Sequence, residues 1–287
     1  MFIYLNPNRN FNFMSIFQRT SSLMISLLLI LLLGAIPACG PDSGSVPKKI
    51  KVATDATLVP MSFMNDQNQI DGFDRALMEA IAKEAGLELE MVNVEWAGLL
   101  GGLTTGKYDA AISSITILEE RKQKMGFSIP YLKSGLAIVV GNQTKGVATL
   151  EDLQNKNMLV GAQRGTTAYF FLKDHPAIRS MGYESYGHAV QDLINGELDA
   201  VLGESTGTLY YKRKDKPVFD KIKMVGEILT NEYYGIAVRK DNPALLNAID
   251  KSLKSLLANG TVKRLHEQWD LGQAAVIPAP GEKPAAG

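Results

Sequence analysis

Polar side chains that could hold a small charged molecule follow four apolar segments of the sequence. Asp55, Ser113 to Thr116, Gln163 to Thr167 and Glu204 each stand at or just beyond the end of such a segment. Carboxylates, hydroxyls and an amide can pair with the charges of a ligand and satisfy its hydrogen bonds. Any one of these groups could simply be polar residues where a strand passes into a loop. Because four segments end in this way, we favour the interpretation that they line one shared cleft.

The elements that must position these side chains alternate between strands and helices, twice over. The first half predicts strands at 49–55, 87–94 and 108–116, with helices at 71–86 and 96–106. The second half predicts strands at 158–163 and 199–203, with helices at 166–172 and 190–195. The order predicts mainly parallel α/β sheets, whose ligands bind beyond the carboxyl ends of the strands.

An internal echo supports two related units. Gly106-Lys-Tyr-Asp-Ala110 enters one predicted strand, and Gly196-Glu-Leu-Asp-Ala200 enters another. Both strands end in polar residues, so each unit is expected to contribute one wall of the cleft.

Composition excludes several classes of function. The chain of 287 residues carries 30 Lys and Arg against 30 Asp and Glu, which does not favour binding to nucleic acid. One Cys and three scattered His indicate no metal site, and no cofactor is expected. Gly101 to Tyr108 resembles a phosphate-binding loop, but Tyr108 replaces the required Ser or Thr and the segment precedes a strand. No catalytic motif is found, so an enzyme is not expected.

The first residues resemble an export signal. Residues 1–38 contain Arg9 and Arg19, no acid, and an apolar run too short to span a membrane. The following Cys39 resembles the lipid acceptor of a bacterial lipobox, and Met14 is an alternative start. We therefore expect an exported protein with a palmitate-bearing anchor at Cys39, facing the periplasm or the outside. A cleaved soluble form and an uncleaved anchor are the alternatives.

Two flanking segments are expected to be loose. Residues 39–47 predict a turn-rich lipidated tether, and residues 273–287 are rich in Ala, Pro and Gly and predict a flexible tail.

Motifs in the same order along the chain resemble those of the bacterial extracellular solute-binding proteins of family 3, the polar amino-acid-binding proteins of ABC importers. The matching segments are Val52 to Thr57, Gly72-Phe-Asp74, Ile115 to Arg121, Phe127 to Tyr131, Gly165-Thr-Thr167, Tyr234 to Arg239 and Asn259 to Trp269. The resemblance implies a periplasmic-binding-protein-like fold of type II, with two α/β lobes joined by two hinge crossovers. It places lobe 1 at 48–130 plus 236–272, lobe 2 at 136–231, and the crossovers near 131–135 and 232–235.

The same resemblance gives roles to the two charged ends of an amino acid. The family's carboxylate-binding Arg falls on Arg121, whose planar fork suits a carboxylate. Thr167, with the backbone of Gly165 and Thr166, would donate further hydrogen bonds to that carboxylate.

For the ammonium group the resemblance indicates Glu204, where the family usually has Asp. Glu is longer by one methylene, so the ammonium or the side chain must shift. Ser114 and Thr116 would complete the ammonium shell through a carbonyl and a hydroxyl.

The remaining expected site residues face the ligand's side chain. Trp96 matches an aromatic position that covers it, although a packing role is the alternative, and Leu58 replaces the usual second aromatic. Asp55 is left as an unpaired carboxylate, which favours Lys, Arg, ornithine, His or Gln and disfavours Glu or Asp. The expected ligand-binding set is Asp55, Leu58, Trp96, Ser113, Ser114, Thr116, Arg121, Gln163, Thr166, Thr167 and Glu204.

The implied function is capture of a free amino acid by a monomer that delivers it to a membrane permease with a separate ATPase subunit. Two alternatives stand beside it: a prephenate or arogenate dehydratase-like enzyme on the same fold, and a receptor subunit that reports the ligand to a membrane kinase.

Overall fold

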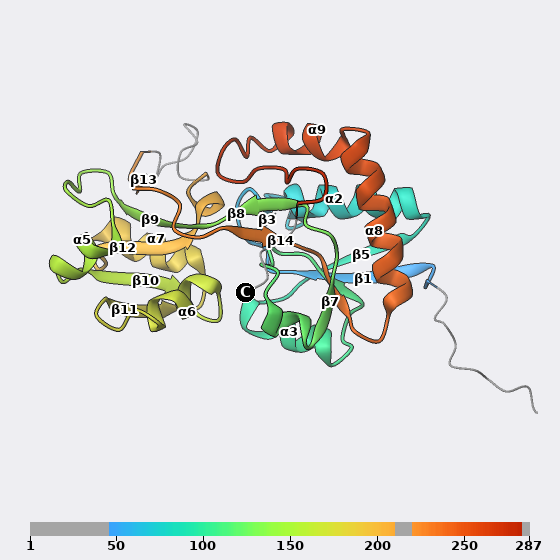
Figure 1. Ribbon diagram of the computed structural model, residues 1–287, viewed down its shortest axis with the longest axis horizontal. Helices are drawn as coiled ribbons and strands as arrows, with labels where there is room; N and C mark the ends of the chain where they lie inside the picture. The colour runs from blue at the N-terminus through green and yellow to red at the C-terminus, as the bar shows by residue number, and fades with distance from the viewer. Residues whose placement is uncertain (1–45, 210–219, 283–287) are drawn as a thin grey trace, which may run out of the picture. The chain divides into compact units, whose positions relative to one another are not determined.

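The computed structural model describes residues 46–209 and 220–282, within one compact unit that starts at Gly44. The predicted signal peptide at 1–38, the expected lipid acceptor Cys39 and the last residues at 283–287 lie outside the described residues. The described chain forms two five-stranded sheets with helices on both faces, together with two smaller sheets (Figure 1).

The first sheet has the order β5-β1-β6-β15-β7. Its strands are β1 (Lys49–Thr54), β5 (Glu88–Asn93), β6 (Ala110–Ala111), β7 (Met125–Phe127) and β15 (Ala237–Arg239). Neighbouring residues along β1 point to opposite faces, so Val52 packs in one core cluster and Ala53 in another. The cluster around Val52 includes residues of α2 (Phe73–Ala85), α8 (Pro243–Ala258) and α9 (Thr261–Gln268), and the cluster around Ala53 includes residues of α3 (Trp96–Thr104).

The second sheet has the order β11-β10-β12-β9-β13. Its strands are β9 (Leu136–Gly141), β10 (Leu159–Gln163), β11 (Arg179–Tyr183), β12 (Ala200–Glu204) and β13 (Ile222–Val225). Helices α5 (Leu150–Asn155) and α6 (Thr167–Lys173) contribute to the cluster on one face, and α7 (Tyr186–Asn195) to the cluster on the other.

The two sheets repeat one pairing pattern. In each, the first three strands in spatial order are parallel, the fourth pairs antiparallel with the third, and the fifth pairs antiparallel with the fourth. The expectation of mainly parallel sheets is therefore wrong for half of the strand pairs, because β7, β9, β13 and β15 were not anticipated. The sheets are mixed.

The two similar sequence segments, Gly106 to Ala110 and Gly196 to Ala200, also have similar structures. Asp109 Oδ2 accepts a hydrogen bond from the N–H of Lys51 at 2.9 Å, and Asp199 Oδ2 accepts one from the N–H of Leu159 at 2.7 Å. Gly106 and Gly196, with φ of 75° and 81°, make the preceding turns in the left-handed region. The same turn therefore delivers the central strand to each sheet.

Two crossover strands connect the elements of the two sheets. β8 (Leu132–Ser134) pairs antiparallel with β14 (Glu232–Tyr234), and in Figure 1 this pair runs between the two groups of elements. An isolated bridge between Thr116 and Tyr234 joins β14 to the loop that follows β6. Both crossovers fall within the segments predicted from the family resemblance.

The described part of the predicted loose tail packs along the crossover strands. Val276 exchanges two backbone hydrogen bonds of 2.8 Å with Lys133 on β8. Glu282 accepts hydrogen bonds from the ammonium of Lys133 at 2.9 Å and from the hydroxyl of Tyr233 at 2.7 Å. These contacts lower the pKa of Glu282 to about 2, with the Tyr233 hydroxyl as the largest cause. Composition did not indicate this packing.

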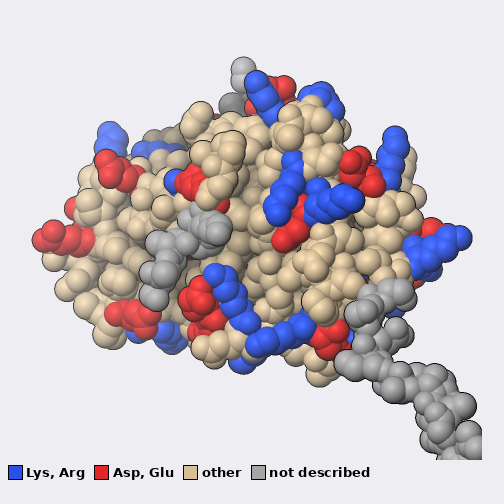
Figure 2. Space-filling model, turned by 45° about the vertical axis from the view of Figure 1, so that its right-hand side comes forward, with Lys and Arg blue, Asp and Glu red and all other residues tan. Residues whose placement is uncertain are grey.

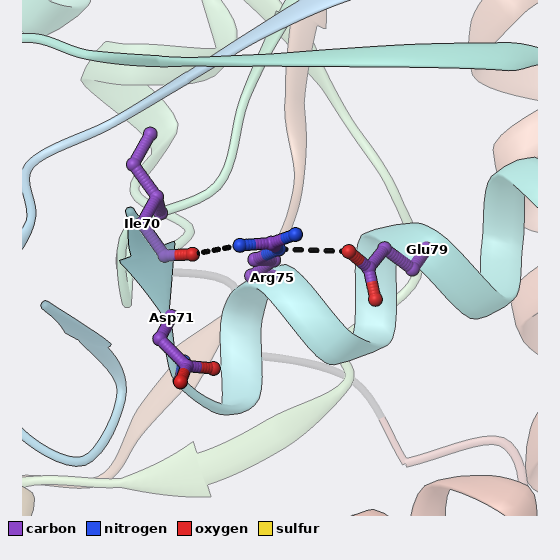
Figure 3. A network of polar contacts seen from close by, with 5 residues as sticks. Ile70, Asp71, Arg75 and Glu79 are labelled. Carbon is purple, nitrogen blue, oxygen red and sulfur yellow. Dashed lines mark hydrogen bonds and ion pairs between the residues drawn. The ribbon is translucent and has the colours of Figure 1, made fainter. Parts of the chain in front are cut away.

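A small three-stranded sheet leads from β1 into α2. Its strands are β2 (Thr57–Leu58), β3 (Ser62–Met64) and β4 (Ile70–Asp71). Arg75 donates to the carbonyl of Ile70 and pairs with Glu79 at 2.7 Å, which ties the end of β4 to the first turns of α2 (Figure 3). Gly72 lies between them with φ of 119°, and a Cβ there would come within 2.5 Å of the Met61 carbonyl oxygen.

Charged side chains are mixed on the surface. On the face shown in Figure 2, Lys and Arg lie interspersed with Asp and Glu, as the balanced composition indicates. Within the described ranges, no helix has both the length and the apolar character needed to cross a bilayer.

Candidate functional site

One pocket brings together all eleven residues expected from the sequence. It encloses about 420 Å³ of space not filled by protein atoms, part of it open to solvent. The lining also includes Thr57, which was not predicted. The expected residues reach the pocket from the ends of β1, β10 and β12, from the loop after β6, and from β2, α3, α4 (Glu119–Lys122) and the start of α6. Residues of both large sheets therefore share one cavity.

Arg121 supplies the positive charge of the pocket. Its residue is 7% exposed, and its Nη1 donates to the Thr116 carbonyl at 2.9 Å. The guanidinium carbon lies 5.7 Å from the centre of the Trp96 ring, within range of a cation–π contact. Burial lowers the pKa of Arg121, although a guanidinium stays charged in proteins. Among the described residues no carboxylate lies within 4.0 Å of this guanidinium, so a ligand carboxylate can supply the missing partner.

Glu204 ends β12 and reaches the pocket from the second sheet. The residue is half-buried, but its carboxyl group is enclosed by protein. The hydroxyl of Tyr234 donates to Oε2, and the hydroxyl of Thr167 donates to Oε1 at 3.2 Å. Burial raises the pKa of Glu204 to about 8, and the nearby charge of Glu232 adds to this rise. Thr167 lines the pocket and contacts Glu204, and its expected hydrogen bond to a ligand carboxylate stays a prediction.

Glu232 lies directly behind the pocket residue Thr116 and was missed by sequence reasoning. It begins crossover strand β14 and is 6% exposed. Its Oε2 accepts from the hydroxyl of Thr116 at 2.6 Å, and its Oε1 accepts from the hydroxyl of Thr230 at 2.9 Å. A Glu at the start of a short strand usually faces solvent, so its position in the sequence gave no signal.

Asp55 is the second carboxylate that lines the pocket, beside Glu204. It is 6% exposed, and burial raises its pKa. Its Oδ2 accepts a long hydrogen bond of 3.4 Å from the amide of Gln163, which joins the two walls. Its Oδ1 is buried and receives no hydrogen bond of normal geometry from the described residues, although the Thr57 hydroxyl and the Trp96 backbone N–H lie near enough to the carboxyl to limit the rise of its pKa. A buried carboxylate oxygen without a donor is costly, and a ligand with a cationic or amide side chain would satisfy it.

Ser114 is held in an uncommon backbone conformation beside the pocket. Its φ is 48°, and its N–H donates to Asp74 Oδ2 at 3.1 Å. Asp74 Oδ1 accepts from the hydroxyl of Tyr131 at 3.0 Å, and burial raises the pKa of Asp74 to about 7. The motif Gly72-Phe-Asp74 was recognised, but no role was predicted for Asp74. The structure shows that this residue fixes the backbone of a pocket residue.

The loop after β10 comes close to Trp96 at the start of α3. Gly165 has φ of 75°, and a Cβ there would stand 3.4 Å from Trp96 Nε1. Thr166 caps α6, since its hydroxyl accepts from the N–H of Tyr169 at 3.3 Å and donates to the Gln163 carbonyl at 2.7 Å. Leu58 packs against core clusters of both sheets. The loop from the second sheet thus reaches the aromatic residue of the first.

Sequence comparison gives a family for this fold and pocket. Residues 50–273 match the profile of the bacterial extracellular solute-binding proteins, family 3. ABC transporter arginine-binding protein 1 of Escherichia coli strain K12 is 32% identical over 245 residues, which covers 83% of this chain and 98% of that protein. The L-cystine-binding protein of the same strain is 30% identical over 220 residues, covering 76% and 81%.

Comparison with solved structures agrees with the family found by sequence comparison. A solved structure described as an ancestral arginine-binding protein bound to arginine superposes with a TM-score of 0.72 at 34% sequence identity, covering 78% of this chain and 99% of that one. These similar proteins are binding proteins rather than enzymes. With the family profile matched over most of its length, the chain belongs to family 3 of the bacterial extracellular solute-binding proteins.

Proposed function

We propose that this protein captures a free amino acid with a cationic side chain and delivers it to an ABC permease that works with a separate ATPase subunit. Arginine, lysine, ornithine and histidine are the favoured ligands, and glutamine is a neutral alternative. The observation that carries the proposal is the unpartnered Oδ1 of Asp55 in a pocket that also holds Arg121 and Glu204.

The charges of the pocket fit a ligand with one negative and two positive groups. A ligand carboxylate would pair with the guanidinium of Arg121, and an α-ammonium would meet Glu204. The sequence left Asp55 as the only further charge, whereas the structure adds the buried carboxylate of Glu232. This excess of acid favours a ligand with net positive charge over a neutral one. Binding proteins for arginine among the similar proteins support the same class of ligand.

Closure about the crossover strands is the proposed mechanism. The pocket is lined from both sheets, and the crossovers are the paired strands β8 and β14. Rotation about such a pair would open the pocket to solvent, and ligand contacts with both walls would favour the closed form.

Calorimetric titration of the purified protein with the twenty common amino acids and ornithine tests the ligand class. We expect the tightest binding with arginine or lysine, weaker binding with glutamine and none with glutamate. Tight glutamate binding without a response to basic or amide ligands would contradict the proposal.

Arg121→Ala tests the recognition of the carboxylate. We expect a loss of at least about 1,000-fold in affinity for every amino acid, because the ligand carboxylate would then be buried without a charged partner. Arg164→Ala is the matched control, since Arg164 is exposed and pairs with Glu184 outside the pocket. The control should keep the wild-type affinity, and unchanged affinity of Arg121→Ala would refute its role.

Membrane attachment through a lipid on Cys39 is part of the proposal. Replacement of the only Cys by Ser removes the lipid acceptor, so Cys39→Ser should move the protein from the membrane fraction to the soluble fraction of the envelope. Radiolabelled palmitate should label the wild-type protein and not the variant. Equal labelling of both would exclude this site.

A further inference from the structure

We propose that Glu232, which does not line the pocket, is the positioning residue that makes the amino end of the site specific for a protonated α-amine. It acts through Thr116 and through its own buried charge. The inference rests on the proposed function and deepens it, because it names a feature of the ligand that the site selects.

The first step concerns the hydroxyl proton of Thr116. A hydroxyl has one hydrogen to donate and two lone pairs to accept. The Thr116 hydroxyl donates its hydrogen to Glu232 Oε2 at 2.6 Å, a short distance typical of a bond to a charged acceptor. Only lone pairs of Oγ1 remain for the pocket. Thr116 is therefore fixed as an acceptor, which matches the N–H groups of an ammonium and does not suit a ligand carboxylate.

The second step concerns what holds Glu232 in place. Its other carboxylate oxygen accepts from Thr230 at 2.9 Å, so both oxygens have hydroxyl donors. The backbone on either side is paired, with the N–H of Ile117 donating to the Tyr233 carbonyl at 2.8 Å and Thr116 bridged to Tyr234. Glu232 thus stands on a strand, β14, that is bridged to the loop carrying Thr116, which keeps the hydroxyl aimed at the carboxylate.

The third step concerns charge. The carboxylate of Glu232 acts on Arg121 more strongly than those of Glu120 and Glu204 do. The charged and titratable groups around the Glu204 carboxyl are Glu232 and Tyr234 on β14, Arg121 on α4 and Tyr131 ahead of β8, with Asp74 of α2 bonded to Tyr131. One guanidinium therefore faces several acids. A second positive charge from the ligand balances this end, whereas a hydroxyl at the same atom of the ligand would not.

The fourth step separates Glu232 from Glu204. Glu204 reaches the pocket from the second sheet, but Glu232 and Thr116 are joined through the crossover strand and the loop after β6. If the two walls move apart on opening, Thr116 and Glu232 stay together. The amine can then be recognised at one wall before Glu204 arrives from the other.

Binding of two probes to the full protein tests this role. The probes are L-arginine and its 2-hydroxy analogue, in which a hydroxyl replaces the α-amine. For the wild type we expect arginine to bind at least about 100-fold more tightly, an amine-to-hydroxyl preference that corresponds to roughly 2.7 kcal/mol. Glu232→Gln keeps the shape and an acceptor for Thr116 but removes the charge, and it should reduce this preference about tenfold.

A pH series adds a readout that a purely structural role would not move. In Glu232→Gln the loss of a neighbouring negative charge should shift the acid-side fall in arginine affinity to lower pH, while the limiting affinity at alkaline pH becomes weaker. Glu120→Gln is the matched control, because it removes one acid near Arg121 from an exposed side chain with no bond to Thr116. It should leave both the preference and the pH series unchanged.

The outcomes distinguish this inference from the proposed function. If the wild type binds no amino acid, the proposed function fails. If the wild type binds arginine and Glu232→Gln shows the same amine preference and the same pH series, only the role of Glu232 is overturned. Should Glu232→Gln fail to fold in a thermal melt, Thr116→Val removes the hydroxyl instead, and an unchanged amine preference in that variant would equally overturn the inference.

Discussion

Asp55 and Gln163 hold the same position in two sheets of the same design. Asp55 follows β1 and Gln163 ends β10, and each strand lies second in spatial order between two parallel neighbours. The side chains meet across the pocket at 3.4 Å, yet one is an acid with an unpartnered oxygen and the other is a neutral amide with a second bond of 3.1 Å to the Glu184 carbonyl. The sheet topology thus determines where each of the two side chains lies. The chemistry of the side chain determines whether its hydrogen bonds are satisfied by the protein or are left for a ligand.

Asp55→Asn should have the largest effect on this comparison, because it makes the two equivalent positions chemically alike. We expect affinity for arginine to fall about 100-fold, with a much smaller change for glutamine, since a buried carboxylate is the partner of the cationic side chain. Calorimetry with both ligands measures the change.

The stability of the same variant provides the control. Removal of a buried, unpartnered charge should leave the melting temperature of the ligand-free protein unchanged or higher. Wild-type arginine affinity in Asp55→Asn would show that the cationic group binds elsewhere.

The pH dependence should come next in size. With a pKa of about 8, Glu204 holds a proton at pH 7 in the ligand-free protein, whereas an α-ammonium requires the carboxylate form. Affinity should therefore weaken about tenfold for each pH unit below 8 and level off above it. Titrations in buffers with different ionisation enthalpies should show release of about one proton. Affinity that is flat between pH 6 and 8 would mean that Glu204 is already ionised.

The folding stability of the ligand-free protein should depend on pH in the opposite direction from ligand affinity. The pKa of Glu204 is raised from 4.5 in the unfolded chain to about 8 in the folded one, so its contribution to stability is greatest below pH 4.5 and is lost as the pH rises through 8. Thermal melts should show that arginine raises the melting temperature more at pH 8 than at pH 6.

Gln163→Ala should have the smallest effect and thereby sharpens the comparison. Its amide donates only a long hydrogen bond to Asp55, so we expect arginine affinity to fall by about threefold or less. Surface plasmon resonance can follow such a change. An effect as large as that of Asp55→Asn would mean that the amide, and not the carboxylate, orders the ligand's side chain.

The sequence predicted the place of the pocket better than its chemistry. Strand-end residues such as Asp55 and Glu204 were found because the carboxyl ends of parallel strands meet at a sheet edge, and all the expected residues line one cavity. Of the strands that were missed, β7 and β15 are only three residues long, too short for a periodic signal.

The direction of the pocket's hydrogen bonds, and the buried acid Glu232 behind the pocket, could not be predicted from the sequence. The bonds of Thr167 to Glu204 and of Thr116 to Glu232 depend on segments 37 and 116 residues apart. Nothing local to Asn231-Glu232-Tyr233 marks a buried acid, since burial there follows from pairing with β8 and with the loop after β6. Long-range contacts of this kind set which groups of Thr116 and Thr167 remain free to donate or accept in the pocket.

The segment from Ala274 to Glu282 gives the crossover strands a neighbour that is attached to the same chain. Its bonds to Lys133, Ser134 and Tyr233 form intramolecularly, so their strength does not depend on protein concentration. In the proposed mechanism, these contacts would influence the ratio of open to closed forms in the ligand-free protein. If the proposed closure operates, substitutions far from the pocket, at Glu282 for example, would change affinity without altering a single ligand contact.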